Sequence, residues 1–205
     1  MKITLLGDSI RGQYAPVVQQ LLGEGFEIFT PQENCRFAQY TLRGLFDWAK
    51  DMQGSQIVHF NCGLWDICDL FGDGLFTPED TYVTCMLRIA DLLLSRYPCV
   101  IFATTTPVRE ENPYDKTADI ARYNERLVPL LRARGVHIND LYAAVAQDVA
   151  ANVSDDYIHL TEQGIRLCAE QTAQCIRTHA ASLTPTAAEP SRPSTAHGAG
   201  APVLI

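Results

Sequence analysis

The chain has 205 residues and a mass of 22.7 kDa, of which 47% are hydrophobic and 20% are charged, so one domain with a sizeable core is expected. A net charge of -8 and a pI near 5.0 argue against a nucleic-acid partner, because such proteins usually carry a basic surface stripe. No uncharged apolar stretch approaches the roughly 18 to 20 residues of a membrane span. We expect neither a nucleic-acid partner nor a membrane span.

The seven cysteines are scattered through the chain, without the dense spacing of a disulfide framework or the paired spacing of a zinc site. We therefore expect free thiols, most of them buried, and no metal. The segment 1–6 is too short for the apolar region of a signal peptide, and we interpret it as the first strand of the fold. A reducing, cytoplasmic location follows as the default expectation.

Short apolar runs alternate with longer amphipathic stretches along the chain. The runs lack a clean period of two, as in parallel strands that are covered on both faces. Expected strands are 3–6, 26–29, 57–60, 100–104 and, more weakly, 136–138. Expected helices are 14–22, 40–50, 77–95 with Thr77 as N-cap, 119–134, 141–151 and 161–179.

This alternation predicts a parallel sheet with helices on both faces, whose ligands bind at the carboxyl ends of the strands. Residues 1–181 form the predicted domain. From 182 to 205 the composition changes to Pro, Ala, Ser, Thr and Gly, which predicts a disordered low-complexity tail.

The segment Gly7-Asp8-Ser9-Ile10 directly follows the first predicted strand. A serine on such a strand-to-helix turn lies near free backbone N–H groups and the positive end of the helix dipole, which favour developing negative charge. The alternative is that Ser9 only caps the helix. The segment lacks the glycine pattern of a phosphate-binding loop, so no nucleotide cofactor is expected.

A second segment, Asp156-Tyr157-Ile158-His159, precedes the last predicted helix. At this spacing the Asp156 carboxylate can reach the Nδ1 of His159 and leave its Nε2 free for the Ser9 hydroxyl. Nucleophile, base and orienting carboxylate together activate a serine for attack on an ester. The alternative is a solvated loop with exposed acids.

A third segment follows the strand 57–60 and supplies hydrogen-bond donors. Asn61 and Gly63 lie where they could stabilise an oxyanion at the carboxyl edge of the sheet. The alternative is a turn glycine beside a buried asparagine.

The three segments together resemble the SGNH/GDSL hydrolase superfamily, through Gly7-Asp8-Ser9-Ile10, the Gly and Asp of 63–66, and the Asp and His of 156–159. The resemblance implies a flavodoxin-like three-layer α/β/α sandwich of about five parallel strands and ester hydrolysis without metal or cofactor. It implies Ser9 as nucleophile, with its N–H in the oxyanion hole, His159 as base and Asp156 as its orienter.

The chain departs from that family in two places. The family's central motif usually reads G-x-N-D, whereas Trp65 stands where the asparagine is expected, so Asn61 is a candidate donor in its place. The family usually has a glycine N–H after the second strand, and Cys35 occupies that place here. We assign Asp8, Trp65 and Asp66 to substrate binding.

The predicted function is a serine esterase that hydrolyses carboxylic esters, and the family resemblance implies short acyl (acetyl) groups on a carbohydrate as its substrate. A lysophospholipase or thioesterase, or a catalytically silent carbohydrate-binding protein of the same fold, are the alternatives. The aromatic residues Phe37, Tyr40, Trp48 and Trp65 suggest either a wall for a sugar ring or, more commonly, core packing. Arg109 suggests either contact with an acidic substrate or a solvated side chain.

Overall fold

The computed structural model describes residues 1–183. Its sheet has five strands: β1 (Lys2–Leu6), β2 (Glu27–Phe29), β3 (Ile57–Phe60), β4 (Cys99–Ala103) and β5 (His137–Asn139). All neighbouring strands are parallel, in the order β2-β1-β3-β4-β5. This is the doubly wound order in which ligands bind where the winding reverses, at the carboxyl ends of β1 and β3. The predicted α/β class and parallel sheet are confirmed.

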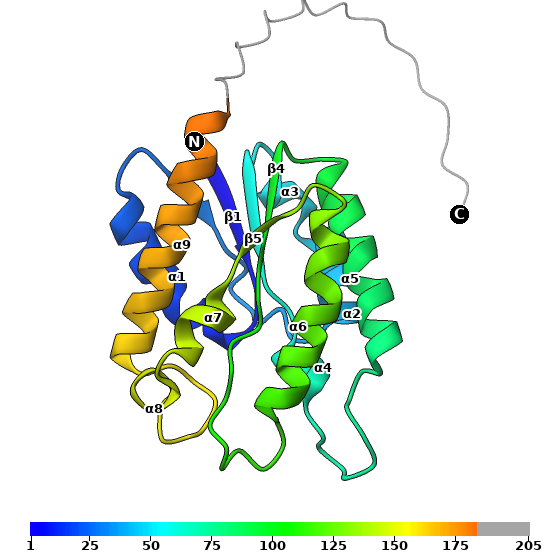
Figure 1. The fold of residues 1–205 in the computed structure, drawn as a ribbon. Helices are drawn as coiled ribbons and strands as arrows, with labels where there is room; N and C mark the ends of the chain where they lie inside the picture. The colour runs from blue at the N-terminus through cyan, green and yellow to red at the C-terminus, as the bar shows by residue number, and fades with distance from the viewer. Residues whose placement is uncertain (184–205) are drawn as a thin grey trace, which may run out of the picture.

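Helices cover both faces of the sheet (Figure 1). One face carries α1 (Ser9–Leu22), α7 (Leu141–Ala146), α8 (Val149–Asn152) and α9 (Glu162–Ser182), and α1 packs along α9. The other carries α2 (Ala38–Asp47), α3 (Ala49–Met52), α5 (Glu79–Leu94) and α6 (Thr117–Arg132), with the short α4 (Leu64–Ile67) at the carboxyl edge. The first and last helices of the described chain are therefore neighbours.

Several elements differ from the sequence predictions. Helix α5 begins at Glu79 with Pro78 as its cap residue and no side-chain cap bond, so Thr77 is not the N-cap. The predicted helix 141–151 is two helices, because the Asp148 carboxylate accepts the N–H of Ala151 and starts α8. Helix α4 has only 4 residues, too few for a periodic pattern to reveal it.

The core lies on both faces of the central strands, since every residue of β3 and β4 is buried. Phe60 and Phe102, paired across these strands, bring their rings to 5.3 Å between centroids. The seven cysteines are free and all but Cys175 are buried. In residues 1–183 no helix is both long and apolar enough to cross a membrane. The predicted tail lies outside the described residues, except that Ser182 still belongs to α9.

Candidate active site

The turn from β1 into α1 presents Ser9 at the carboxyl edge of the sheet. The Asp8 carboxylate caps α1 by accepting the N–H of Ile10 at 3.0 Å, so Ser9 is the first helical residue and is not the cap. Gly7 is required by close packing, because a Cβ there would lie 2.6 Å from the Cβ of Arg11. The Ser9 side chain is thereby left free to face the last segment of the domain.

Ser9, His159 and Asp156 form one continuous hydrogen-bonded chain. The Oγ of Ser9 lies 2.9 Å from the Nε2 of His159, and the Nδ1 of His159 lies 2.8 Å from an Oδ of Asp156. The structure therefore brings together two segments that are 150 residues apart in the sequence. The distances are those of a nucleophile, a general base and an orienting carboxylate in hydrogen-bond contact.

The Asp156 carboxylate is held by several donors besides the imidazole. Its Oδ1 accepts the hydroxyl of Ser154 at 2.7 Å and the backbone N–H groups of Ile158 and His159 at 3.1 and 2.8 Å. Burial acts to raise the pKa of Asp156, but these hydrogen bonds outweigh it and hold the pKa well below its usual range. Asp156 thus stays charged and fixes the imidazole so that Nε2 faces Ser9.

Two side chains hold the His159 segment in place, a role that the sequence did not indicate for either of them. Gln13 exchanges two hydrogen bonds with the backbone of Leu160: its Oε1 accepts the Leu160 N–H at 3.0 Å, and its Nε2 donates to the Leu160 carbonyl at 3.2 Å. Gln13 lies one helical turn after Ser9 on α1, and that spacing places both on the same helix face. The spacing of Gln13 from Ser9 could therefore have indicated its position beside the site from the sequence alone.

Arg109 is the second positioning side chain, and its role corrects both sequence interpretations of it. Its guanidinium donates to the carbonyls of Val153 and Ala150 at 2.8 and 3.1 Å and pairs with Asp155 at 3.0 Å. Its backbone N–H donates to the carbonyl of Tyr157, a residue with the unusual φ of 74°. Arg109 therefore binds the loop that carries Asp156 and His159, rather than remaining free in solvent.

Three groups at the carboxyl edge of the sheet can donate hydrogen bonds to an oxyanion. Within the described residues, the N–H groups of Ser9 and Gly63 donate to no acceptor of the protein. The Asn61 amide gives one hydrogen bond to the carbonyl of Ala103 at 3.2 Å, which leaves its second hydrogen available. The Cβ of Asn61 lies 3.4 Å from the position a Cβ of Gly7 would take, so Asn61 is adjacent to the nucleophile turn.

The structure contradicts three of the predicted site roles. The N–H of Cys35 donates to the carbonyl of Gly7 at 3.1 Å, so it is not a free oxyanion donor. Asp66 is fully buried, and its carboxylate accepts the N–H of Ala38 at 2.9 Å. It thereby caps the start of α2, where the N-cap residue Phe37 makes no side-chain hydrogen bond. Asp8 is 1% exposed and caps α1. Both carboxylates are buried and accept a backbone N–H at the start of a helix, so neither side chain faces a substrate.

Buried ionisable groups around the site have displaced pKa values. Burial raises the pKa of Asp8 to about 6 and that of Asp66 to about 7, against the lowering effect of their backbone hydrogen bonds. Burial lowers the pKa of His59 to about 4, so this strand histidine stays neutral near pH 7. His59 is bonded to Asn139 and faces the core, so it does not compete with His159 for the role of base.

Trp65 and a set of exposed apolar side chains lie on the same edge of the sheet as the triad. Trp65 is 44% exposed, so it can contact a ligand as predicted, and its function remains a prediction. Trp48, by contrast, is buried and donates its indole N–H to Glu33, so it is a core residue. The remaining exposed members, on the segment after α4 and the loop before α6, are Leu70, Phe71, Phe76 and Tyr114.

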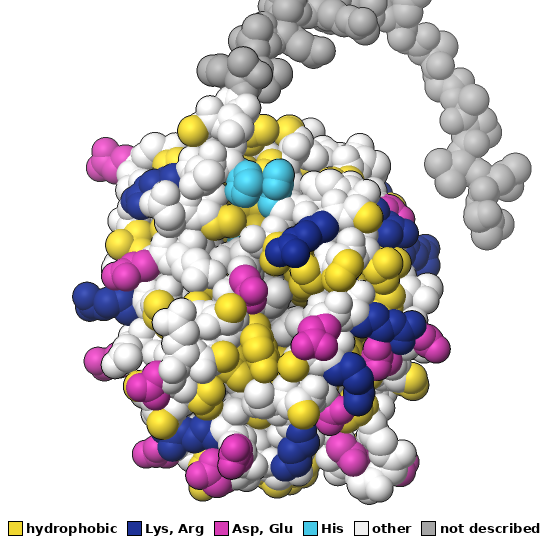
Figure 2. All heavy atoms as spheres, in the orientation of Figure 1, with side chains coloured by type: hydrophobic (Ala, Val, Ile, Leu, Met, Phe, Trp, Pro, Cys, Tyr) yellow, Lys and Arg dark blue, Asp and Glu magenta, His cyan; other side chains and the backbone are white. Residues whose placement is uncertain are grey.

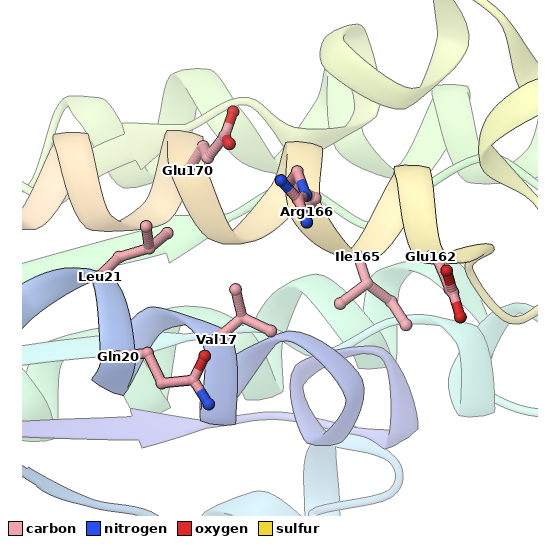
Figure 3. A pocket seen from close by; sticks show the side chains of 7 residues that line it. All are labelled: Val17, Gln20, Leu21, Glu162, Ile165, Arg166 and Glu170. Carbon is pink, nitrogen blue, oxygen red and sulfur yellow. The ribbon is translucent and has the colours of Figure 1, made fainter.

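A separate groove lies between α1 and α9 on the outer face of the molecule (Figure 3). It encloses about 440 Å³ and is lined by Val17, Leu21 and Ile165 with the charged residues Glu162, Arg166 and Glu170. None of the three triad side chains lines it. We therefore assign the candidate chemistry to the carboxyl edge of the sheet and not to this groove.

Comparison with solved structures assigns the fold. The lipase/acylhydrolase from Enterococcus faecalis superposes with a TM-score of 0.75 at 18% identity, covering 91% of this chain and 99% of that one. A G-D-S-L lipolytic protein from Veillonella parvula gives 0.71 at 18% identity, with 86% and 98% covered. An acetyl xylan esterase gives 0.69 at 17% identity, with 86% and 100% covered. The chain has the three-layer α/β/α fold of the SGNH/GDSL hydrolases.

Sequence comparison alone is less informative. No family model matches the chain. An uncharacterized protein from Schizosaccharomyces pombe is 33% identical over 89 residues, which is 40% of this chain and 29% of that protein. The match thus spans less than a third of the relative's length. At these identities the structural likeness is informative about the fold, and the activity has to be argued from the site.

Proposed function

We propose that the chain is a serine esterase of the SGNH/GDSL type that hydrolyses carboxylic esters. The observation that carries the proposal is the hydrogen-bonded chain from Ser9 through His159 to Asp156, at 2.9 and 2.8 Å. A serine, an imidazole and an ionised carboxylate in this order are the groups needed for acyl transfer. The fold shared with known esterases and acylhydrolases supports the same reaction class.

In the proposed reaction His159 Nε2 removes the proton of the Ser9 hydroxyl as its Oγ attacks the acyl carbon. The resulting oxyanion accepts hydrogen bonds from the N–H groups of Ser9 and Gly63 and from the Asn61 amide. The tetrahedral intermediate then collapses, and the alcohol leaves with the proton held by His159. Water, deprotonated by the same imidazole, attacks the acyl-enzyme; the bond to Ser9 Oγ then breaks, Oγ takes back the proton from His159, and the acid is released. None of these steps requires a cofactor.

The substrate we propose is a short acyl ester, such as an acetyl group on a carbohydrate. The structural neighbours include an acetyl xylan esterase and an acetyl-xylooligosaccharide esterase from Geobacillus Stearmophilus. Trp65 and Tyr114, 44% and 50% exposed, offer aromatic faces for a sugar ring near the triad edge. The exposed Leu70, Phe71 and Phe76 favour a second candidate, an ester with a longer acyl chain, as in a lysophospholipase or thioesterase.

A fluorophosphonate probe tests whether the serine is activated. We expect covalent labelling of the wild-type protein, no labelling of Ser9→Ala, and unchanged labelling of Ser95→Ala, whose hydroxyl lies on a distant helix end and donates to Leu92. Absence of labelling in the wild type, together with retained carbohydrate binding, would instead identify a catalytically silent binding protein. Initial rates on acetylated xylo-oligosaccharides and on long-chain esters then separate the two substrate classes.

The cysteines support a reducing location for this activity. All seven are free, and burial raises the pKa of thiols such as Cys99 and Cys168, to about 11 and about 12. Unpaired thiols in this number are typical of proteins of the cytoplasm.

A further inference from the structure

Three potential metal ligands lie together at the edge of the sheet opposite the triad. Cys99 is the first residue of β4, His137 is the first residue of β5, and His179 lies in the last turns of α9. Because the strands are parallel, their first residues share the amino edge of the sheet, whereas Ser9 follows the carboxyl end of β1. Figure 2 shows histidine side chains gathered on the surface beside the end of α9.

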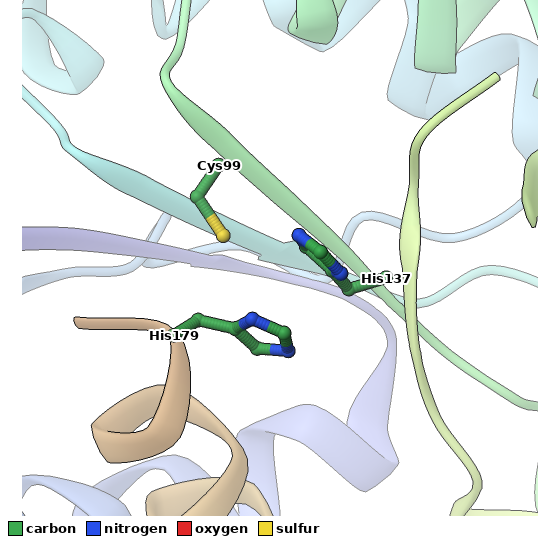
Figure 4. Close-up of side chains that lie close together, drawn as sticks. All are labelled: Cys99, His137 and His179. Atoms are coloured by element: carbon green, nitrogen blue, oxygen red, sulfur yellow. The ribbon is translucent and has the colours of Figure 1, made fainter. Parts of the chain in front are cut away.

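The ligand atoms of the three residues already converge. The Cys99 sulfur and one nitrogen from each of His137 and His179 all lie within 4.8 Å of one another. Figure 4 shows the Cys99 sulfur directed toward the two imidazoles. Ligand atoms of a tetrahedral zinc ion, at about 2.0 to 2.3 Å from the metal, are about 3.3 to 3.8 Å apart, so closure by roughly 1 Å would complete the site.

The ligands differ in accessibility in a way that suits an ion entering from solvent. Cys99 is 4% exposed, His179 is half-buried and His137 is exposed. The two rings lie face to face, with their centroids 3.8 Å apart and their planes inclined by 29°. Because an imidazole nitrogen binds a metal in the plane of its ring, the two stacked rings would have to turn relative to each other for both to bind one ion.

We propose that Cys99, His137 and His179 bind one zinc ion, with water in the fourth position. One thiolate and two imidazoles form a ligand set that suits Zn²⁺ in both charge and softness. On binding, the Cys99 thiol releases its proton to solvent, both imidazoles bind as neutral ligands, and no electron is transferred. The proposal does not depend on the esterase function.

The bound ion would join the end of α9 to two strands of the sheet. The first residue of α9, Glu162, follows His159 by three positions, and α9 packs against α1, α7, α8 and β5. A zinc ion at its far end would therefore strengthen the attachment of the element that follows the catalytic histidine. It would do so without contacting the triad.

The test is cobalt and zinc binding to the full-length, chelator-treated and reduced protein. We expect one Co²⁺ per chain, with a thiolate-to-cobalt charge-transfer band in the near ultraviolet that equimolar Zn²⁺ removes. The band should be absent in Cys99→Ala, and the affinity for Zn²⁺ should fall by about tenfold or more in His137→Ala and His179→Ala. Zn²⁺ at a hundredfold excess over its Kd should raise the melting temperature by about 5 °C or more.

Matched controls distinguish this site from other thiols and imidazoles. Cys85→Ala removes a similarly buried thiol on α5, and His159→Ala removes the imidazole of the opposite edge; both should keep the band and the affinity. His137→Ala and His179→Ala replace accessible residues, so these variants should fold even if Cys99→Ala does not. Equal zinc affinity in the wild type and both histidine variants, or Co²⁺ binding without the thiolate band, would overturn the proposal.

Discussion

The Gln13 side chain and the Leu160 backbone bind each other in both directions, with the Gln13 Oε1 accepting at 3.0 Å and its Nε2 donating at 3.2 Å. Gln13 belongs to the same helix as Ser9, and Leu160 directly follows His159. The pair therefore fixes the distance between the proposed nucleophile and its base, although neither residue takes part in the chemistry.

We expect Gln13→Ala to lower kcat by about 10- to 100-fold and to change KM little, because misplacing a general base slows the chemical step more than it weakens binding. Gln13→Glu keeps the acceptor for the Leu160 N–H and should recover part of the loss. Steady-state kinetics on para-nitrophenyl acetate measure kcat and KM for both variants. The control is Gln19→Ala, which removes another α1 amide that donates to a backbone carbonyl, that of Phe26. An equal loss of kcat in both variants would contradict a specific positioning role.

Ser9→Ala and His159→Ala should each lower kcat/KM by about 10³-fold or more, and the double variant should be only slightly worse than either. The two groups act in one proton transfer, so removing the second costs little once the first is gone. His179→Ala is the matched histidine control and should retain full activity in metal-free buffer. Additive losses of Ser9→Ala and His159→Ala would argue that they act independently.

The activity should fall toward acid pH, because the base has to be unprotonated to accept the Ser9 proton. Asp156 does not cause this acid limb, because its hydrogen bonds hold its pKa well below its usual range. Next to Ser9 the competing explanation is Asp8, since burial raises its pKa to about 6.

Asp8→Asn separates these two explanations. Asparagine keeps the capping oxygen of α1, so the variant should fold, and the acid limb of the pH–rate profile should persist. If the limb disappeared in Asp8→Asn, the titrating group would be Asp8 rather than His159. Asp156→Asn should instead lower kcat by about 10⁴-fold across the whole profile, because the imidazole loses its orienting partner.

Asn61 and Trp65 should have separable effects. Asn61→Ala should lower kcat by about 10²- to 10³-fold with little change in KM, as expected for the loss of an oxyanion donor. Trp65→Ala should leave kcat on para-nitrophenyl acetate unchanged and raise KM for an acetylated oligosaccharide, because an exposed indole offers a ring face and not a donor to the oxyanion. If Trp65→Ala reduced kcat on the small ester and Asn61→Ala did not, the oxyanion donor would be Trp65 and not Asn61.

The sequence predicted the sheet well because apolar strands and amphipathic helices leave strong, local patterns. All five strands were located to within a residue or two, for example 57–60 for β3, which is Ile57–Phe60 in the structure. The position of Ser9 after the first strand and of Asp156 and His159 before the last helix was predictable for the same reason. Their side chains meet in the structure at hydrogen-bond distances of 2.9 and 2.8 Å.

The parts that were not predicted depend on long-range contacts. Nothing local in Asp66 indicates that its carboxylate starts α2 by accepting the Ala38 N–H. Similarly, the N–H of Cys35 is consumed by the carbonyl of Gly7, a pairing across 28 positions of sequence that no periodicity reveals. Arg109 acts through the carbonyls of a loop more than 40 positions later. The hydrogen-bond partners of these groups depend on segments that come together only in the folded protein, so only the three-dimensional structure shows them.

The adjacency of α1 and α9 bears on how the protein is made. A ribosome has to add 150 further amino acids after Ser9 before the imidazole that activates it exists, and α9 has to follow to hold that imidazole in place. Until then the nascent polypeptide carries an ordinary alcohol at Ser9. If the proposed esterase reaction is correct, hydrolytic activity would arise only once α9 has been synthesised and packed against α1, and a product that ends before this helix would be inert.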